Sequence, residues 1–308
     1  LAYEGNAQGF RLLVRNEHHP DKGGMRLTCA TLGAFMKYPW LATHSNDAND
    51  NAHNVQKFGC FYSETSQLEE LAACLHLPRS THHDGFARHP LAYLLEAADD
   101  ICYALIDLED GINLNMLTYS EVATIFYELI GEHPDSVSLP VHMSVRQSLA
   151  SLRSRAMMRL VNTITDAFVA NSEDLLAGTL QGSLFAHCDT TVQTGILQAK
   201  QLAREKIFNH PNKVRMELMA NQCLHRLMDA FVPLAWTGTE VVEAAASMSF
   251  EQQSLLRLLQ PHLDEHRRVL SDNIYHNILN ILDFITGMND HEAYRLAQEL
   301  QGHWGTVV

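Results

Sequence analysis

Residues 94–111 read LLEAADDICYALIDLEDG, and this stretch decides the fold class. Within it and just before it, apolar residues recur mostly at spacings of three and four: Leu91, Leu94, Leu95, Ala98, Ile101, Cys102, Leu105 and Ile106. Because an α-helix turns once in about 3.6 residues, this spacing gathers the apolar side chains on one stripe of a helix. The same stretch carries six carboxylates and no lysine or arginine that could balance them.

The same periodicity recurs along the rest of the chain. Further apolar stripes occupy residues 149–168, 224–231 and 274–285. Breaker segments separate the stripes, among them HHPDKGG (18–24), GEHPDS (131–136) and NHPN (209–212). No segment sustains the apolar and polar alternation that indicates a strand. The sequence therefore predicts an all-α fold.

Composition narrows the class of protein. The chain has 308 residues, 46% of them hydrophobic, and a net charge of −14, so any phosphate-binding site must be a local basic spot. No apolar run is long enough to cross a bilayer, and we expect no membrane span. Six cysteines without a CxxC pair favour reduced thiols and a cytoplasmic protein. The chain begins at Leu1 without a signal segment, which suggests part of a longer protein.

The acidic stretch allows two interpretations. On a helix, Asp99, Tyr103, Asp107 and Asp110 fall within one arc of the surface. Carboxylates crowded on one face repel unless a cation or hydrogen-bond donors neutralise them, and a divalent metal with oxygen ligands is one solution. A solvated acidic face is the other, and spacing alone favours it.

Two basic spots accompany the acidic face. The segment YEGNAQGFRLLVR (3–15) brings Asn6 close to two arginines, although Asn6 could simply start a helix. In LGAFMKYPW (32–40), Lys37 and Tyr38 precede a proline that should end a helix. A lysine followed by an aromatic residue can hold a phosphate and pack against a sugar or base. An ordinary last helical turn has the same pattern.

Six segments taken together are more specific than any one of them. In chain order they are YEGNAQGFRLL, LTCATLGAFMKYPW, KFGCFYSE, PLAYLLEAADDICYALIDLEDG, IFNHPNKVRMEL and DFITGMNDHEAY. This series resembles bacterial deoxyguanosine triphosphate triphosphohydrolases, the HD-domain enzymes that convert dGTP to deoxyguanosine and tripolyphosphate. The resemblance implies an HD-domain-like helical fold with a C-terminal helical extension. Residues 1–115 would be the C-terminal portion of the catalytic domain and residues 116–308 the helical extension, or both one continuous domain.

The resemblance also implies a role for each matching residue. Asp99 matches the last ligand of the HD metal site, which holds a divalent metal, Mg²⁺ or Mn²⁺. Tyr103 matches the aromatic residue that packs on the deoxyribose, and Asp107 the carboxylate that accepts the sugar 3′-hydroxyl. Asn6, Lys37 and Tyr38 match groups around the triphosphate. Glu217 matches an acidic residue at the base pocket, suited to accept from guanine N1–H and N2–H₂.

The family's remaining metal ligands and its catalytic His and Glu have no counterpart in this chain. His18, His19, His82 and His83 do not lie in an HD context, so we expect no catalytic residue here and no turnover by this segment alone. The resemblance further implies a homo-oligomer, with single-stranded DNA or a nucleotide as effector. Two alternatives stay open: a triphosphohydrolase with broader deoxynucleotide preference, and a non-catalytic helical module for nucleotide binding or oligomerisation.

Overall fold

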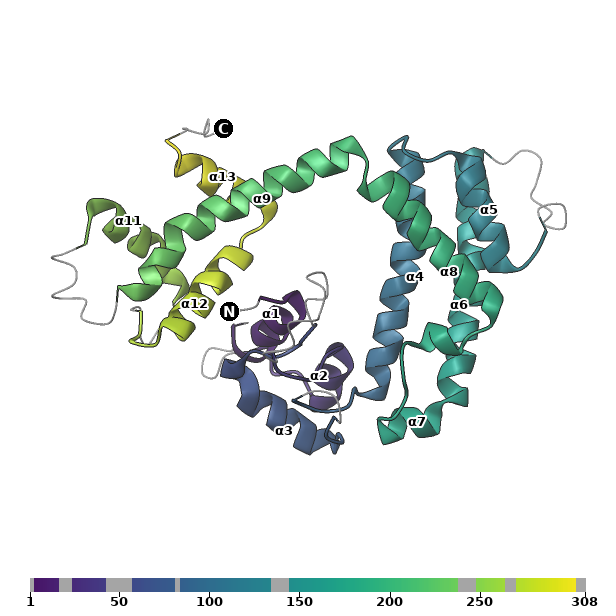
Figure 1. The fold of residues 1–308 in the computed structure, drawn as a ribbon, viewed down its shortest axis with the longest axis horizontal. Helices are drawn as coiled ribbons and strands as arrows, with labels where there is room; N and C mark the ends of the chain where they lie inside the picture. The colour runs from purple at the N-terminus through teal and green to yellow at the C-terminus, as the bar shows by residue number, and fades with distance from the viewer. Residues whose placement is uncertain are drawn as a thin grey trace, which may run out of the picture. The chain divides into compact units, whose positions relative to one another are not determined.

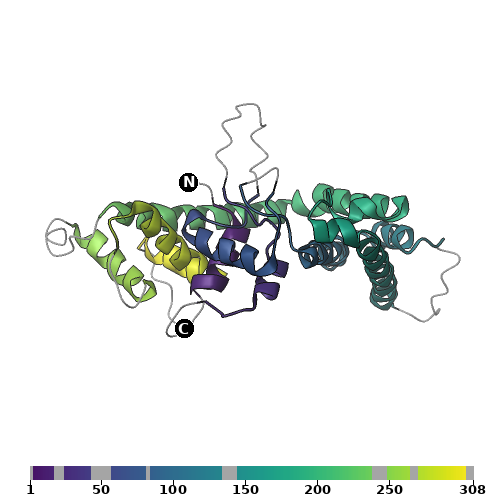
Figure 2. The same cartoon turned by 90° about the horizontal axis from the view of Figure 1, so that it is seen from below.

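A computed structural model describes residues 3–16, 24–42, 57–80, 84–133, 144–237, 248–263 and 270–302. His18, His19, His82 and His83 lie outside these residues. Every element of the described chain is a helix, and the only β contacts among them are three isolated bridges (Figures 1 and 2). The predicted all-α fold is confirmed.

The chain divides into two compact units between Lys213 and Val214. The first unit opens with α1 (Gly5–Arg11), η1 (Leu12–Asn16), α2 (Cys29–Phe35), η2 (Tyr62–Glu64) and α3 (Thr65–Leu75). Side chains before α1 and α2 accept from free N–H groups of the first turn, which begins each helix. A small apolar core joins these elements: Phe10, Met36, Leu41, Cys60, Leu68, Leu71, Ala72 and Phe86.

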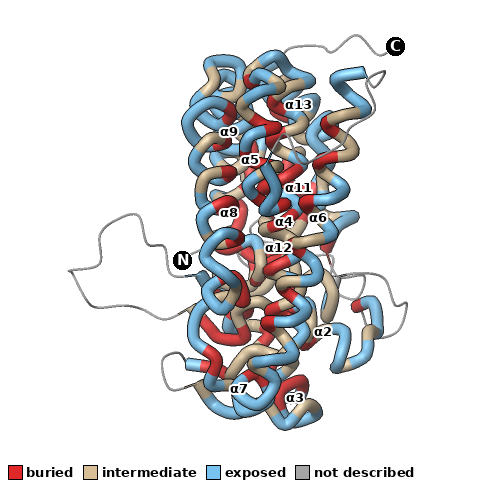
Figure 3. The backbone as a smooth tube through the Cα atoms, turned by 90° about the vertical axis from the view of Figure 1, so that its right-hand side faces the viewer, coloured by how far each residue is buried: buried red, intermediate tan, exposed pale blue. Residues whose placement is uncertain are grey.

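The acidic stretch forms the long helix α4 (Pro90–Asn113). His89 accepts a hydrogen bond from the backbone of Leu91, and Pro90 supplies a backbone angle suited to the first helical position. The buried side of α4 packs into a large core with α5 (Tyr119–Ile130), α6 (Val145–Ala170) and α8 (Thr190–Leu202). The short elements α7 (Ser172–Ala177) and η4 (Leu184–His187) lie between α6 and α8, and η5 (Ala203–Phe208) follows α8. Figure 3 shows the buried positions recurring along the helices.

Basic residues from other elements neutralise most of the carboxylates on α4. The ion pairs are Arg88–Glu96, Lys37–Asp99, Lys200–Asp100 and Arg153–Glu109. Lys200 comes from α8 and Arg153 from α6, so these pairs also link the helices around the core. The helix therefore needs no lysine or arginine of its own.

The second unit contains most of α9 (Pro211–Phe231), then η6 (Val232–Trp236), α11 (Phe250–Leu259), η7 (Gln260–His262), α12 (Ile274–Thr286) and α13 (Asp290–Glu299). Its separate core is built on Leu227, Phe231, Leu259 and Ile281. The buried Asn277 donates to the backbone oxygens of Ala235 and Ser271, which ties α12 to η6.

The predicted boundary between residues 115 and 116 concerns the extent of a catalytic domain, and it stays a prediction. The two compact units divide about a hundred residues later. Within the described residues, no helix is both long enough and apolar enough to cross a membrane.

Candidate functional site

Lys37 and Asp99, 62 positions apart in sequence, meet in the structure. The Lys37 Nζ donates to Asp99 Oδ2 at 2.5 Å, and the two side chains are 17% and 44% exposed. α2 ends at Phe35, and Met36 already has an extended backbone, so Lys37 lies beyond the last helical turn. Its position is therefore explained by the partner on α4 and not by the dipole of its own helix. The basic spot after α2 and the acidic face of α4 therefore meet at this ion pair.

Tyr38 is held in an extended segment beside this ion pair. Its ring packs against Trp40 with centroids 5.4 Å apart, and the Arg88 guanidinium lies 5.5 Å from its centroid. The residue after Tyr38, Pro39, disfavours helix at Tyr38 and accepts from the Phe86 N–H at 2.9 Å. A Cβ on Gly85 would lie 2.3 Å from the Pro39 oxygen, so only glycine at position 85 allows this segment to approach Pro39 so closely.

The Glu4 carboxylate caps the start of α1 by accepting hydrogen bonds from Asn6. Glu4 Oε2 accepts from the Asn6 backbone N–H at 2.6 Å and from its side-chain amide at 2.8 Å. The other oxygen of Glu4 accepts from Lys57 Nζ at 2.8 Å. Burial alone would raise the pKa of Glu4, but the hydrogen bonds from Lys57 and Asn6 outweigh it and hold this pKa below its usual value.

Lys57 is a site residue that the sequence reasoning missed. Its hydrogen bond and attraction to Glu4 raise the pKa of the ammonium, and the nearby Tyr38 hydroxyl acts in the same direction. Lys57 therefore adds a second cation at the start of α1, through its ion pair with Glu4. The available signal was its place at the head of KFGCFYSE, one of the six segments of the resemblance.

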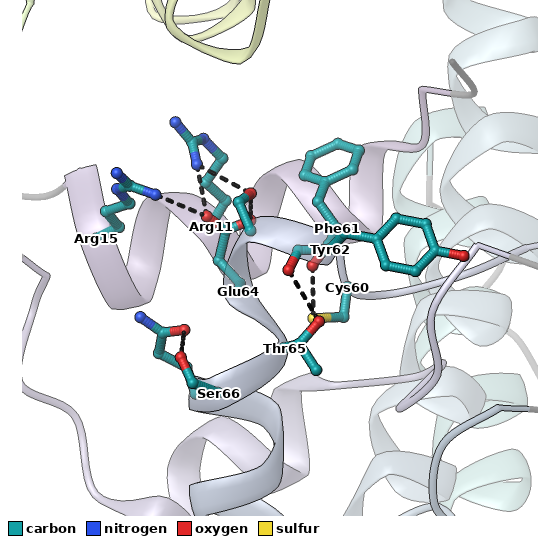
Figure 4. Close-up of polar contacts among 10 residues, drawn as sticks. Arg11, Arg15, Cys60, Phe61, Tyr62, Glu64, Thr65 and Ser66 are labelled. Atoms are coloured by element: carbon teal, nitrogen blue, oxygen red, sulfur yellow. Dashed lines mark hydrogen bonds and ion pairs between the residues drawn. The ribbon is translucent and has the colours of Figure 1, made fainter. Parts of the chain in front are cut away.

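A buried ion pair fixes α1 in place. Arg11 Nη1 lies 2.5 Å from Glu64 Oε1, and the two side chains are 2% and 0% exposed. Figure 4 shows Arg11 and Arg15 both directed at Glu64, with Arg15 at 3.4 Å. Ser63 donates to the other Glu64 oxygen at 2.7 Å. The arginines of the basic opening are thus engaged in holding α1 against η2.

Tyr103 and Asp107 follow Asp99 along α4 at intervals of about one helical turn. Tyr103 is 58% exposed, so its ring is accessible from solvent. Asp107 is half-buried, and burial, followed by the charge of Asp110, raises the pKa of its carboxyl, while Lys213 opposes the shift. The four residues of the predicted arc, Asp99, Tyr103, Asp107 and Asp110, all lie on the single helix α4, and Asp99 contacts Lys37.

Glu217 lies on the part of α9 that belongs to the second unit, and it is exposed. Its role at a base pocket stays a prediction.

The described residues do not by themselves form a metal site. No group of three or more His, Cys, Asp or Glu side chains gathers among them in ligating geometry. Asp99 has an accessible carboxylate, but its nearest charged partner is Lys37. The described residues therefore offer Asp99 as one candidate oxygen ligand and not a complete site for a divalent cation.

Comparison with known proteins gives the family. No family model matches the chain. A Pseudomonas aeruginosa protein named deoxyguanosinetriphosphate triphosphohydrolase-like protein is 40% identical over 304 residues, which cover 98% of this chain and 66% of that protein. A Synechocystis protein of the same name is 33% identical over 303 residues, covering 97% and 65%.

The chain belongs to the deoxyguanosinetriphosphate triphosphohydrolase-like family. A Cronobacter sakazakii protein named deoxyguanosinetriphosphate triphosphohydrolase is 28% identical over 331 residues, covering 95% of this chain and 62% of that protein. The chain thus spans about two thirds of the length of these members of the deoxyguanosinetriphosphate triphosphohydrolase-like family.

Proposed function

We propose that this chain forms the deoxynucleotide-binding part of a triphosphohydrolase that converts dGTP and water to deoxyguanosine and tripolyphosphate. The observation that carries the proposal is the contact between Lys37 and Asp99, which joins a local cation to an accessible acidic face in a protein of net charge −14. A triphosphate would be repelled elsewhere on such a surface, and a local cation offsets that repulsion.

The phosphate end of the nucleotide belongs near Lys37. The ammonium groups of Lys37 and Lys57 each pair with a carboxylate, Asp99 and Glu4 respectively, and Lys37 precedes Tyr38 in the chain. Phosphate oxygens compete well for such groups, because charge-assisted hydrogen bonds are the strongest that a lysine makes. Asn6 marks the same end of the site through Glu4.

The sugar belongs one turn further along α4. Four residues of helix advance about 6 Å, so Tyr103 and Asp107 lie one and two such steps from Asp99. A tyrosine ring over C2′ would leave no room for a hydroxyl there and would favour deoxyribose. A carboxyl oxygen of Asp107 is suited to accept the 3′-hydroxyl.

We also propose that the activity requires a divalent metal, Mg²⁺ or Mn²⁺, with Asp99 as one ligand. The metal would supply Lewis-acid stabilisation of charge at the α-phosphate. Asp99 is the one ligand that the resemblance assigns to residues 1–308, and alone it would bind such a cation no better than a surface carboxylate does. By the same resemblance, we expect residues 1–308 by themselves to bind nucleotide without turnover.

A second candidate is a triphosphohydrolase of broader base preference. Six of the seven proposed contacts address phosphate, metal or sugar, which all four deoxynucleotides share. Glu217 alone is expected to address the base, and this expectation rests on the family resemblance.

Product analysis of the full-length gene product tests the proposal. With dGTP and Mn²⁺, we expect deoxyguanosine and tripolyphosphate in equal amounts and no activity in excess chelator. Release of orthophosphate or pyrophosphate with dGDP or dGMP would place the attack at another phosphorus and contradict the proposal. Equal rates on all four deoxynucleotides would favour the broader enzyme.

A further inference from the structure

Arg88, in the segment just before α4, contacts two tyrosine rings and one carboxylate. Its guanidinium carbon lies 5.5 Å from the Tyr38 ring centroid and 5.2 Å from that of Tyr93. Its Nη1 donates to Glu96 Oε2 at 2.9 Å. The Arg88 and Glu96 side chains are 19% and 20% exposed, so the group is largely shielded from water.

Two of the three partners are fixed to the core. Tyr93 is buried in the first turn of α4, and its hydroxyl donates to the Leu180 oxygen at 3.2 Å. Glu96 lies one turn further along the same helix. An arginine fork that pairs with a carboxylate and also packs on a ring is held in a narrow range of orientations.

The third partner, Tyr38, is only half-buried and follows the end of α2. The edge of Trp40 packs against its ring, and the Arg88 cation lies near the ring as well. Because Glu96 already neutralises Arg88, little of its charge is left for a phosphate. Its remaining interaction is with the tyrosine ring.

We infer that Arg88 is a positioning residue, which transmits the fixed geometry of α4 to the Tyr38 ring and thereby shapes the phosphate end of the nucleotide site. The inference rests on the proposed function, in which Tyr38 borders the triphosphate. It goes beyond that function by proposing that Arg88 sets the orientation of the Tyr38 ring and acts on the nucleotide only through that ring.

A double-mutant cycle on nucleotide binding tests this inference. The probe is dGTPαS, whose thio-substituted α-phosphate slows hydrolysis, titrated into the full-length gene product by calorimetry. Arg88→Gln should weaken binding roughly three- to thirtyfold, the range expected for a partly shielded cation–ring contact. In a Tyr38→Ala background the same change should have almost no further effect, because two residues that act through one another are not additive.

Two further variants keep the test decisive. Glu96→Gln frees Arg88 without removing it, and should weaken binding in the same direction by a smaller factor. Arg79→Gln is the matched control: the Arg79 guanidinium lies 4.3 Å from the Phe86 ring in the neighbouring segment, and its loss should leave binding within about twofold. Folding of each variant is checked by circular dichroism and thermal unfolding.

The outcomes separate the possibilities. An equal loss from Arg88→Gln in both backgrounds would show that Arg88 acts independently of Tyr38, as a direct phosphate ligand or a general support, and would overturn the inference. Unchanged binding by Arg88→Gln would overturn it too, while leaving the proposed function intact. A wild-type protein that binds no dGTPαS would instead contradict the proposed function itself.

Discussion

At the scale of single residues, the structure explains why one helix carries six carboxylates. Glu96, Asp99, Asp100 and Glu109 each face a basic side chain from another element. The sequence identified the acidic face and the nearby Lys37, but for separate reasons. Their contact depends on tertiary packing across 62 positions, which helical periodicity cannot show.

Ion pairs between distant segments decide the roles of three cations, and the sequence does not show these pairs. The sequence showed Arg11 and Arg15 only as a basic spot beside Asn6, and in the fold both are directed at Glu64, about fifty positions later. Lys57 was not predicted, because its one sequence signal was its place at the head of KFGCFYSE, and its ion pair with Glu4 forms only in the fold. Charge pairs between distant segments decide which cations remain at a site.

Tyr103 should determine the preference for deoxyribose. Its ring is exposed one turn from Asp99, so Tyr103→Ala should reduce activity of the full-length gene product on dGTP and raise the relative activity on GTP several-fold. The measurement is the ratio of kcat/KM values for the two nucleotides. Tyr62→Ala removes an equally exposed tyrosine elsewhere in the first unit and serves as control. An unchanged ratio for Tyr103→Ala would show that this ring does not discriminate between the two sugars.

At the scale of elements, the helices were predictable where their signals are local. The apolar stripe predicted a helix across residues 91–106, and α4 extends it to Pro90 and Asn113. Capping supplies the ends: among the residues that the structure describes, four helices begin with a reciprocal side-chain cap, as at Thr118 and Glu121 of α5. The π-helix η1 directly after α1 has no such sequence signal, and the prediction did not include it.

The cap of α5 makes stability depend on pH. Hydrogen bonds from Lys206 and from Thr118 lower the pKa of Glu121 from 4.5 to about 2. Because the folded-state value is the lower one, the stabilisation is present above pH 4.5 and is lost as pH falls toward 2. Glu121→Gln keeps the cap geometry and removes the charge, so it should destabilise the protein at pH 6 by about 0.5 kcal/mol.

Urea unfolding of wild type and Glu121→Gln at pH 6, 4 and 3 measures this effect. The difference in unfolding free energy should shrink at each step down in pH. A difference that stays constant over this range would mean that the Glu121 charge contributes nothing through Lys206. Glu292→Gln is the matched control, since it closes the same kind of cap on α13.

At the scale of the whole molecule, the predicted site residues are divided unequally between the two compact units. The first unit contains six of the seven predicted site residues, and four of these lie close to Lys37 or on the same face of α4. Glu217 belongs to the second unit, and its role stays a prediction. Periodicity predicted the fold class, but no local pattern indicated that the division falls after Lys213.

The most direct test of the account compares two lysines that pair with neighbouring carboxylates. Lys37 pairs with Asp99, and Lys200 pairs with Asp100 at 2.9 Å. Binding of dGTPαS to the full-length gene product is measured for Lys37→Ala and for Lys200→Ala. Losing a charge-assisted phosphate contact should weaken binding roughly ten- to hundredfold for Lys37→Ala, and Lys200→Ala should stay within about twofold of wild type. Equal binding by both variants would contradict a nucleotide site at Lys37 and Asp99.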